Sequence, residues 1–343
     1  MDAGPLNADI AELAAAAGLP AGGLRIDACA GGGNNRVFVV HAGGERVVAK
    51  WYFRHPSDTR DRLAAEYAFL EYAAGCGVRS VPRPLSCDPA RGLALYEFVE
   101  GRRIDAGEVG VRHVDAAAAF FLAINAPAGR AAAGRLPFAS EACFSIAEHL
   151  ALVEARIARL DGIDGSLAVG AEARAFVGEL RVAWEGIRAG LSRTIAASAP
   201  GAATDVLDEA SRCVSPSDFG FHNALERPDG TLCFLDFEYA GRDDPAKMAG
   251  DFFAHPAVPV PPALKDRFIG QTMAFAPDAP ALAARARLLE PVFRTKWCCI
   301  MLNEFLPDAA QRRRFADPGA DSDTRRRLQL DKARRHLPRP GGH

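Results

Sequence analysis

Lysine is scarce in this sequence. Only five of the 41 basic residues are lysines, and the rest are arginines; the lysines are Lys50, Lys247, Lys265, Lys296 and Lys332. The high content of alanine, arginine and glycine indicates a compositional bias of the coding sequence rather than selection for arginine chemistry. Each position that keeps a lysine is therefore a candidate for a specific role.

Several other features are missing, and each absence excludes a class of protein. The eight cysteines form neither Cys-x-x-Cys pairs nor clusters with histidine, which disfavours zinc and dithiol sites. In a chain of 343 residues, scattered cysteines are typical of reduced thiols, so we expect a cytoplasmic protein. The longest apolar run, near residues 116–124, is about half the ~20 residues that span a bilayer. No association with a membrane is expected.

Charge and motif content narrow the function further. The net charge of −2 gives no field that attracts nucleic acid, so no nucleic-acid partner is expected. Neither Gly-x-Gly-x-x-Gly nor the Walker sequence Gly-x4-Gly-Lys-Ser/Thr occurs, which disfavours Rossmann and P-loop folds. The sequence contains no signal that defines an oligomeric state.

The order of predicted elements indicates an α+β fold with two lobes. A helix over about 6–17 precedes β-rich runs at 24–29, 36–41 and 46–53, and a helix over 58–74 follows. The run LALYEFVEG at 93–101 predicts one more strand. Residues 1–98 are thus expected to form a small antiparallel β lobe with one helix besides the leading helix at about 6–17, residues 99–103 a hinge, and residues 104–343 a larger, mainly helical lobe. Its helical composition is concentrated at 112–126, 145–161, 170–195, 281–305 and 324–336.

Lys50 lies in the strand-like run VVAKWYF, where alternation places it on the same face as Val48. It is either an edge-strand lysine that faces water or a cation that binds an anion. Glu66, on the following helix, borders the inward face marked by Leu63 and Leu70. It is either a solvated glutamate or the partner of a lysine that contacts nucleotide phosphates.

The glycine-rich segment GGGNN at 31–35 has two interpretations. Glycine and asparagine suit a hairpin tip with positive φ. The same composition suits a flap whose backbone N–H groups cover phosphates, with Gly32, Gly33, Asn34 and Asn35 as candidate nucleotide-binding residues.

The stretch RCVSPSDFGFHNALERPDGTLCFLDFEYA at 212–240 carries the strongest signal. A hairpin with CVSPS running out, FHNAL back, and LCFLDF next brings Asn223 close to Asp236, with Asp218 nearby. An amide oxygen and a carboxylate form a sparse oxygen site that suits Mg²⁺, whose other ligands are water and substrate phosphates. Asp218 can then accept the proton of an attacking hydroxyl. The alternative is that all three residues cap turns.

The ordered series from about residue 30 to 254 resembles the aminoglycoside phosphotransferase and choline kinase branch of the protein-kinase-like fold. The matching pieces are GGGNNRVFVV, VVAKWYF, AAEYAFLEYAAGCGVRSVPRPL, LALYEFVEGRRI, SDFGFHNAL and FLDFEYAGRDDPA.

The resemblance implies a role for each matching residue. Lys50 would hold the α- and β-phosphates of ATP or GTP, and Glu66 would hold Lys50. Asp218 would be the catalytic base, and Asn223 and Asp236 the ligands of Mg²⁺. The adenine pocket would be lined mainly by backbone of Glu97, Phe98 and Val99.

Three parts of the sequence depart from the family pattern or lie outside it. Pro216-Ser217 stands where the family has a histidine-containing pair before the catalytic aspartate. Lys247 and Met248 stand near a position where the family often has an aspartate; Lys247 is either a helix-surface lysine or a contact to an anionic acceptor. The segment 290–306, with Arg294, Lys296, Trp297, Asn303 and Glu304, is either a wall of the acceptor site or a buried helix with polar residues in solvent.

The sequence therefore predicts an ATP-dependent phosphotransferase that acts on a hydroxyl of a small molecule such as a sugar, an amino alcohol or an aminoglycoside. The segment between Asp236 and the turn AGRDDP is too short for a protein-kinase activation segment, which favours a small acceptor. The alternative is a nucleotide-binding module without phosphotransfer, which the pair Pro216-Ser217 motivates.

Overall fold

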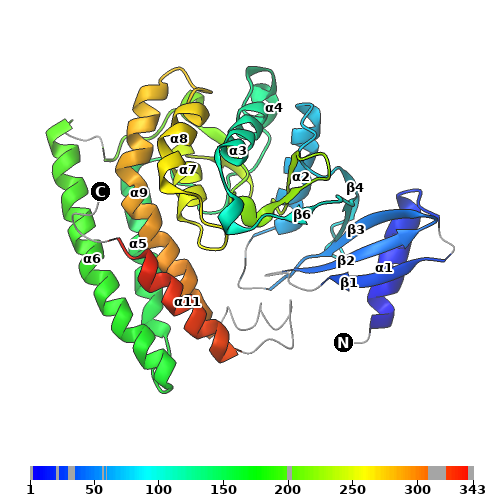
Figure 1. Ribbon diagram of the computed structural model, residues 1–343, viewed down its shortest axis with the longest axis horizontal. Coiled ribbons are helices and arrows are strands. Elements are labelled where there is room, and N and C mark those ends of the chain that lie inside the picture. The colour runs from blue at the N-terminus through cyan, green and yellow to red at the C-terminus, as the bar shows by residue number, and fades with distance from the viewer. Residues whose placement is uncertain are drawn as a thin grey trace.

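The computed structural model describes residues 3–20, 23–29, 35–55, 58, 60–198, 203–307 and 322–338. A β-rich lobe lies at one end of the molecule and a larger group of helices at the other (Figure 1). Gly32, Gly33 and Asn34, predicted as nucleotide-binding residues, lie outside the described residues.

The small lobe is a five-stranded antiparallel sheet of order β1-β2-β3-β5-β4. Its strands are β1 (Arg25–Cys29), β2 (Arg36–Ala42), β3 (Glu45–Trp51), β4 (Pro84–Asp88) and β5 (Leu93–Glu97). Helix α1 (Ala3–Ala16) packs Ile10 and Leu13 against one face of the sheet. Because side chains alternate along a strand, Ala49 contributes to this core while Lys50 lies on the opposite face.

Helix α2 (Arg62–Gly75) follows the third strand and carries Glu66. It begins where the Asp61 carboxylate accepts a hydrogen bond of 3.0 Å from the backbone N–H of Ala64, a standard N-cap. Phe69 on its buried face stacks on Phe237 at 4.5 Å between ring centroids. This contact fixes α2 against the chain segment that follows Asp236.

Two small sheets carry the polar loops of the larger lobe. The sheet β6-β8-β9 contains Arg102–Arg103, Ala224–Glu226 and Leu232–Phe234, and β7 (Cys213–Ser215) pairs with β10 (Gly241–Asp243). The predicted proximity of Asn223 and Asp236 is confirmed, because Ala224 pairs with Phe234 at the end of the β8–β9 hairpin. The predicted pairing of CVSPS with FHNAL is wrong: the first strand pairs with β10.

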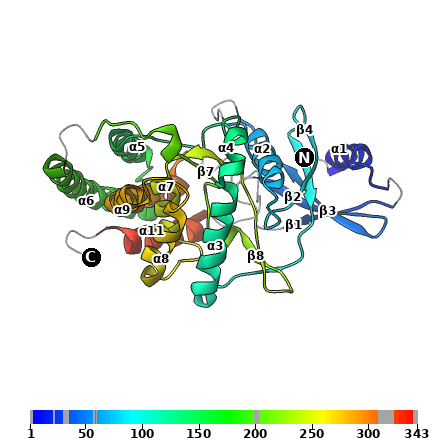
Figure 2. The same ribbon diagram turned by 90° about the horizontal axis from the view of Figure 1, so that it is seen from above.

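Helices form most of the rest of the larger lobe and extend from these small sheets away from the β-rich lobe (Figure 2). They are α3 (Val111–Ile124), α4 (Arg130–Ala133), α5 (Ile146–Arg159), α6 (Ala168–Ser198), α7 (Pro245–Ala254), α8 (Lys265–Met273), α9 (Ala279–Leu302) and α11 (Ser322–His336). The five predicted helical stretches correspond to α3, α5, α6, α9 and α11, whereas α4, α7 and α8 were not predicted. Within the described parts of the chain, no helix combines the length and hydropathy needed to cross a bilayer.

Helices α7 and α9 pack so closely that one contact needs a glycine. A Cβ atom on Gly250 of α7 would lie 2.1 Å from Cδ2 of Phe293 on α9, and Phe293 is buried. Because both backbones are helical, neither can move away without disturbing its neighbours. The absence of a side chain at Gly250 therefore sets the distance between the two helices.

Gly250→Ala should lower the free energy of unfolding by about 3 kcal/mol, since the added methyl overpacks this contact. Urea unfolding followed by circular dichroism measures the change. Gly178→Ala is the matched control, because Gly178 lies in α6 with nothing within 4 Å of an added Cβ; it should raise the free energy of unfolding by about 1 kcal/mol. Equal effects of the two substitutions would contradict the packing argument.

Candidate active site

A cleft of about 880 Å³ lies where the β-rich lobe meets the helical lobe, and residues from both lobes line it. Four non-glycine residues of the described chain have positive φ, and all four line this cleft; they are Glu141, Ser217, Asp218 and Asp236. A non-glycine residue in this region costs on the order of 1–3 kcal/mol and is held there by its surroundings. The concentration of strained backbone marks the cleft as a functional site.

Lys50 joins the two lobes through two carboxylates. Its Nζ lies 2.6 Å from Oε2 of Glu66 and 2.5 Å from Oδ1 of Asp236. Glu66 also accepts hydrogen bonds from the hydroxyl of Tyr52, at 2.6 Å, and from the backbone N–H of Phe237, at 3.3 Å. The predicted Lys50–Glu66 pair is therefore present, and the alternatives of a water-facing lysine and a solvated glutamate are wrong.

Burial and charge act in opposite directions on Lys50. Burial by itself would lower the pKa of the ammonium, but the charges of Asp236, Glu66 and Glu238 outweigh it and hold the pKa well above its ordinary value. The lysine therefore stays protonated at every physiological pH. A permanent cation inside the cleft is suited to binding the phosphate oxygens of a nucleotide.

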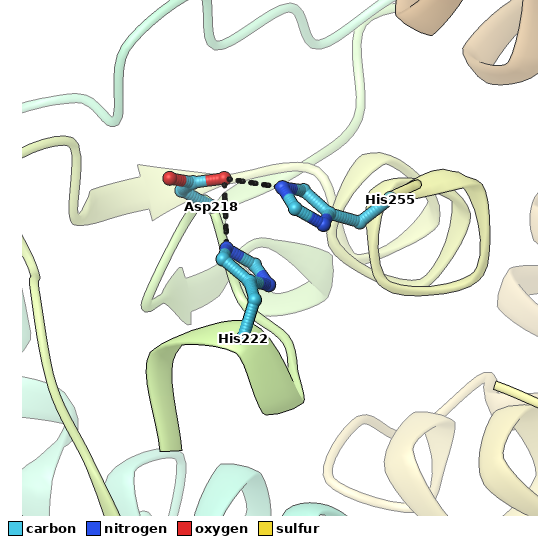
Figure 3. Close-up of side chains that lie close together, drawn as sticks. All are labelled: Asp218, His222 and His255. Carbon is cyan, nitrogen blue, oxygen red and sulfur yellow. Dashed lines mark ion pairs between the residues drawn. The ribbon is translucent and has the colours of Figure 1, made fainter. Parts of the chain in front are cut away.

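Asp218 lies between two imidazole rings that come from different elements (Figure 3). His222, in the 3₁₀ turn Phe221–Asn223, places Nε2 at 3.5 Å from Oδ1, and His255, at the end of α7, places Nε2 at 3.6 Å. Burial alone would raise the pKa of Asp218, but the contacts with His222, His255 and Asn223 lower it to about 2. The carboxylate is thus ionised at neutral pH.

These three side chains also have the composition of a metal site, but their geometry does not fit one. The rings of His222 and His255 stack at 3.4 Å between centroids with an interplanar angle of 3°. An imidazole nitrogen binds a metal in the plane of its ring, and two stacked parallel planes do not share such a point. Both rings instead support Asp218.

The sequence did not identify His255 as a site residue. Pro216-Ser217 lack the histidine that was expected beside Asp218, and His255 supplies a histidine there instead. A histidine does face the aspartate, but α7 supplies it from 37 positions along the chain rather than the residues just before Asp218. The signal that could have found it is the spacing of Lys247, Asp251 and His255, which recur every four residues. Such spacing places three polar side chains on one face of a helix, and all three line the cleft.

Asn223 and Asp236 offer oxygens that suit a divalent cation. The amide N–H of Asn223 donates to the backbone carbonyl of Asp218 at 3.1 Å, which leaves its Oδ1 without a partner among the described residues. Oδ1 of Asp236 accepts a hydrogen bond from Lys50, and Oδ2 of Asp236 has no partner among the described residues. Two hard oxygen ligands at the edge of a cleft fit an ion that keeps several waters, such as Mg²⁺.

The remaining predicted nucleotide-binding residues also line the cleft. Asn35 is buried; its side chain donates to Oε2 of Glu238 at 2.5 Å and accepts from the backbone N–H of Phe53 at 3.1 Å. The Glu97 carboxylate accepts from the backbone N–H of Arg83 at 3.1 Å, and Arg46 lies 4.1 Å over the ring of Phe98. Val99 is the third residue of this predicted adenine pocket.

The structure corrects the interpretations of Lys247 and of the C-terminal helix. Lys247 is buried rather than on a helix surface, and its Nζ bonds to Oδ2 of Asp243 at 2.6 Å. For the segment 290–306, the alternative of a buried helix with its polar residues in solvent is wrong for Lys296 and Glu304, which are buried. The members of this segment that line the cleft are Lys296, Trp297, Ile300, Met301, Asn303 and Glu304. Arg294 instead donates to the backbone carbonyl of His336.

The arrangement of lobes and cleft is that of the protein-kinase-like fold, and solved structures share it. Choline kinase LicA from Streptococcus pneumoniae matches with a TM-score of 0.59 and 15% identity, over 97% of this chain and 98% of its own. A choline/ethanolamine kinase family protein from Mesorhizobium loti gives 0.57 and 18%, over 98% and 95%. Macrolide 2′-phosphotransferase MphH from Brachybacterium faecium gives 0.54 and 18%, over 91% and 99%. The predicted fold is confirmed.

The sequence pattern of the phosphotransferase enzyme family (APH) matches residues 25–282, and the chain belongs to this family. Membership confirms the predicted relationship and the predicted enzyme class, an ATP-dependent phosphotransferase that acts on an alcohol group. A comparison with curated protein sequences gives no match.

Lys50→Met should lower the free energy of unfolding by about 3 kcal/mol, because it leaves two carboxylates in the cleft without their shared cation. Urea unfolding at neutral pH measures the change. Lys265→Met is the control, since Lys265 pairs with Glu290 where both side chains are partly exposed; its cost should stay below about 1 kcal/mol. Indistinguishable effects of the two variants would show that the Lys50 pair does not hold the lobes together.

His255→Phe should retain the stacking on His222 but remove the nitrogen that faces Asp218. We expect a fall in kcat of about tenfold to a hundredfold, as misplacement of a reacting group produces. The pKa of Asp218 should rise toward its ordinary value, so the acid limb of the pH–kcat/KM profile should move to higher pH. His41→Phe, on β2 outside the cleft, is the control. An unchanged pH profile would show that His255 contributes packing and does not affect the pKa of Asp218.

Proposed function

We propose that this protein transfers the γ-phosphoryl group of ATP or GTP to a hydroxyl of a small molecule. The observation that carries the proposal is the convergence of three groups in one cleft: the ionised Asp218, the paired oxygens of Asn223 and Asp236, and the buried cation Lys50. Phosphoryl transfer needs little covalent chemistry from a protein, so positioning and charge neutralisation by such a set suffice.

In the proposed reaction Asp218 orients the acceptor hydroxyl and accepts its proton. The acceptor oxygen forms a bond to the γ-phosphorus as the bond from that phosphorus to the bridging oxygen breaks, and the nucleoside diphosphate leaves with the bridging oxygen. His222 and His255 hold the carboxylate in place from two sides. Because the pKa of Asp218 is about 2, the group is available as a base throughout the neutral range.

The nucleotide is proposed to bind along the β-rich side of the cleft. Lys50 would contact its phosphates, and backbone groups of Glu97, Phe98 and Val99 would contact the base. Asn223 and Asp236 would hold Mg²⁺, which supplies neutralisation of phosphate charge when bound. LicA, whose fold this chain shares, has been solved in complex with AMP, which supports an adenine nucleotide here.

A small acceptor and a cytoplasmic location are part of the proposal. Proteins of the same fold carry the names choline kinase, ethanolamine kinase and macrolide phosphotransferase, all of which denote small acceptors. All eight cysteines are free thiols, which fits a reducing compartment. No nucleic-acid or membrane partner is proposed.

A nucleotide-binding module without transfer is the competing function. Pro216-Ser217 motivated this alternative, because these residues replace the histidine-containing pair expected before Asp218. The two histidines beside Asp218, together with the free oxygens of Asn223 and Asp236, support catalysis instead.

Asp218→Asn should reduce kcat by about 10²- to 10⁴-fold, because the amide cannot accept the hydroxyl proton. The dissociation constant for Mg·ATP, measured by isothermal titration, should stay close to that of the unmodified protein. Asp229→Asn is the matched control, because Asp229 lies in the β8–β9 turn and, among the described residues, its side chain bonds to Thr231 alone; it should leave kcat unchanged. Full turnover by Asp218→Asn would overturn the assignment of the base.

A further inference from the structure

The few lysines of the chain are concentrated in one place. Four of the five line the cleft, namely Lys50, Lys247, Lys296 and Lys332, and the fifth, Lys265, pairs with Glu290 elsewhere. Lys50 pairs with Glu66 and Asp236 on the side of the cleft where the nucleotide is proposed to bind. The other three lie on α7, α9 and α11, in the helical wall of the cleft. Apart from His255, which follows the last residue of α7, this wall has no role in the chemistry described above.

Lys247 and Lys296 form a buried pair of ammonium groups around one carboxylate. Lys296 bonds to Oδ2 of Asp251 at 2.6 Å, while Lys247 lies 4.0 Å from the same oxygen and bonds to Asp243. The indole N–H of Trp297 donates to the other oxygen of Asp251 at 2.9 Å. Both oxygens of the shared carboxylate thus already have donors.

Several hydrogen-bond donors of the cluster have no acceptor among the described residues. An ammonium carries three N–H donors and a guanidinium five, yet Lys247 and Lys296 make one hydrogen bond each with the described residues. Arg156 on α5 pairs with Glu141 through Nη2, but its buried Nε and Nη1 have no partner in the described chain. All three cations line the cleft. A ligand that brings oxygen acceptors would satisfy donors that the protein leaves open.

The charges around Lys296 also favour a ligand that carries a negative charge. Burial lowers the pKa of this ammonium, and the positive charge of Lys247 lowers it further; Asp251 and Glu141 oppose both effects without overcoming them. An additional negative charge between the two lysines would stabilise both ammonium forms. A quaternary ammonium offers no oxygen acceptor to these donors.

We propose that the acceptor carries an oxyanion, a carboxylate or a phosphate ester, in addition to the hydroxyl that is phosphorylated. Lys247, Lys296 and Arg156 bind the oxyanion, and Asp218 receives the hydroxyl. This inference rests on the proposed function, and it separates this chain from kinases of the same fold that act on cationic amino alcohols.

Direct contacts connect the two ends of this acceptor site. Asp218 lies 3.6 Å from His255, whose ring meets that of Trp297 at 4.5 Å between centroids. Trp297 bonds to Asp251, which bonds to Lys296. The hydroxyl end and the anion end are therefore parts of one continuous wall, with the Trp297 indole between them as an apolar surface for the carbon chain of the acceptor.

The test is a panel of matched acceptors with the unmodified full-length protein, Mg²⁺ and ATP. The pairs are glycerate with glycerol and glucose 6-phosphate with glucose, and choline and ethanolamine are the cationic members. Release of ADP and the mass of the product are measured. We expect kcat/KM for at least one anionic compound to exceed that of its neutral partner by about 30-fold or more, the effect of a buried charge contact. The two pairs distinguish a carboxylate from a phosphate ester.

Two variants and a control connect the preference to the lysines. Lys296→Gln should raise KM for the preferred anionic acceptor about 30-fold, whereas Lys296→Arg should retain the preference because it keeps the charge. Lys265→Gln removes a lysine outside the cleft and should change neither value. If Lys296→Gln does not fold, the panel with the unmodified protein still decides the question.

The outcomes separate this inference from the proposed function. Turnover of neutral or cationic compounds without preference for an anionic partner would overturn the inference and leave phosphoryl transfer intact. Absence of ADP release with every compound would count against the proposed function. In that case the melting temperature of the protein, saturated with Mg²⁺ and a non-hydrolysable ATP analogue, is measured with added inorganic phosphate. A rise that Lys296→Arg retains and Lys296→Gln loses supports the anion site; no rise overturns it.

Discussion

The ion pairs that the buried Lys50 makes with Glu66 and Asp236 are the interaction on which the rest of this structure depends. One ammonium, on the central strand of the small sheet, neutralises Glu66 from α2 and Asp236 from the larger lobe. Without it, two carboxylates would face each other across the junction of the lobes, and removal of one partner from a buried ion pair is strongly destabilising. The same cation that joins the lobes is, in the proposed function, the group that contacts the nucleotide phosphates.

Backbone strain is the second constraint on the cleft. Ser217 and Asp218 adopt left-handed conformations in succession, and Asp236 does so after β9. Short hydrogen-bonded pieces on each side hold them: the amide of Asn223 bonds to the carbonyl of Asp218, and the backbone N–H of Leu235 donates to the carbonyl of Asn223 at 2.8 Å. Backbone strain is thus concentrated where the chain brings Asp218, Asn223 and Asp236 into one cleft.

Most of the fold was accessible from the sequence because its signals are local. The two-residue alternation of β2 and β3, the helical spacing of α2, and the ordered series of Lys50, Glu66, Asp218, Asn223 and Asp236 predicted the small lobe and the candidate site. The predictions that failed concern contacts between segments that are far apart in the sequence. The strand before Asp218 pairs with β10 rather than with its neighbour in sequence. The burial of Lys247 and Lys296 depends on how α7 packs against α9, and no local pattern encodes that. His255 reaches Asp218 by the same packing.

Helix α7 has a consequence for how recognition and chemistry are linked. Lys247 and Asp251 lie about one turn apart on α7, His255 follows directly after its last residue, and Gly250 fixes the distance of this helix from α9. The packing of α7 against α9 therefore places the cations around Asp251 and the histidine beside Asp218 in the same wall of the cleft. A change in that packing would alter the surroundings of Asp251 and of Asp218 together.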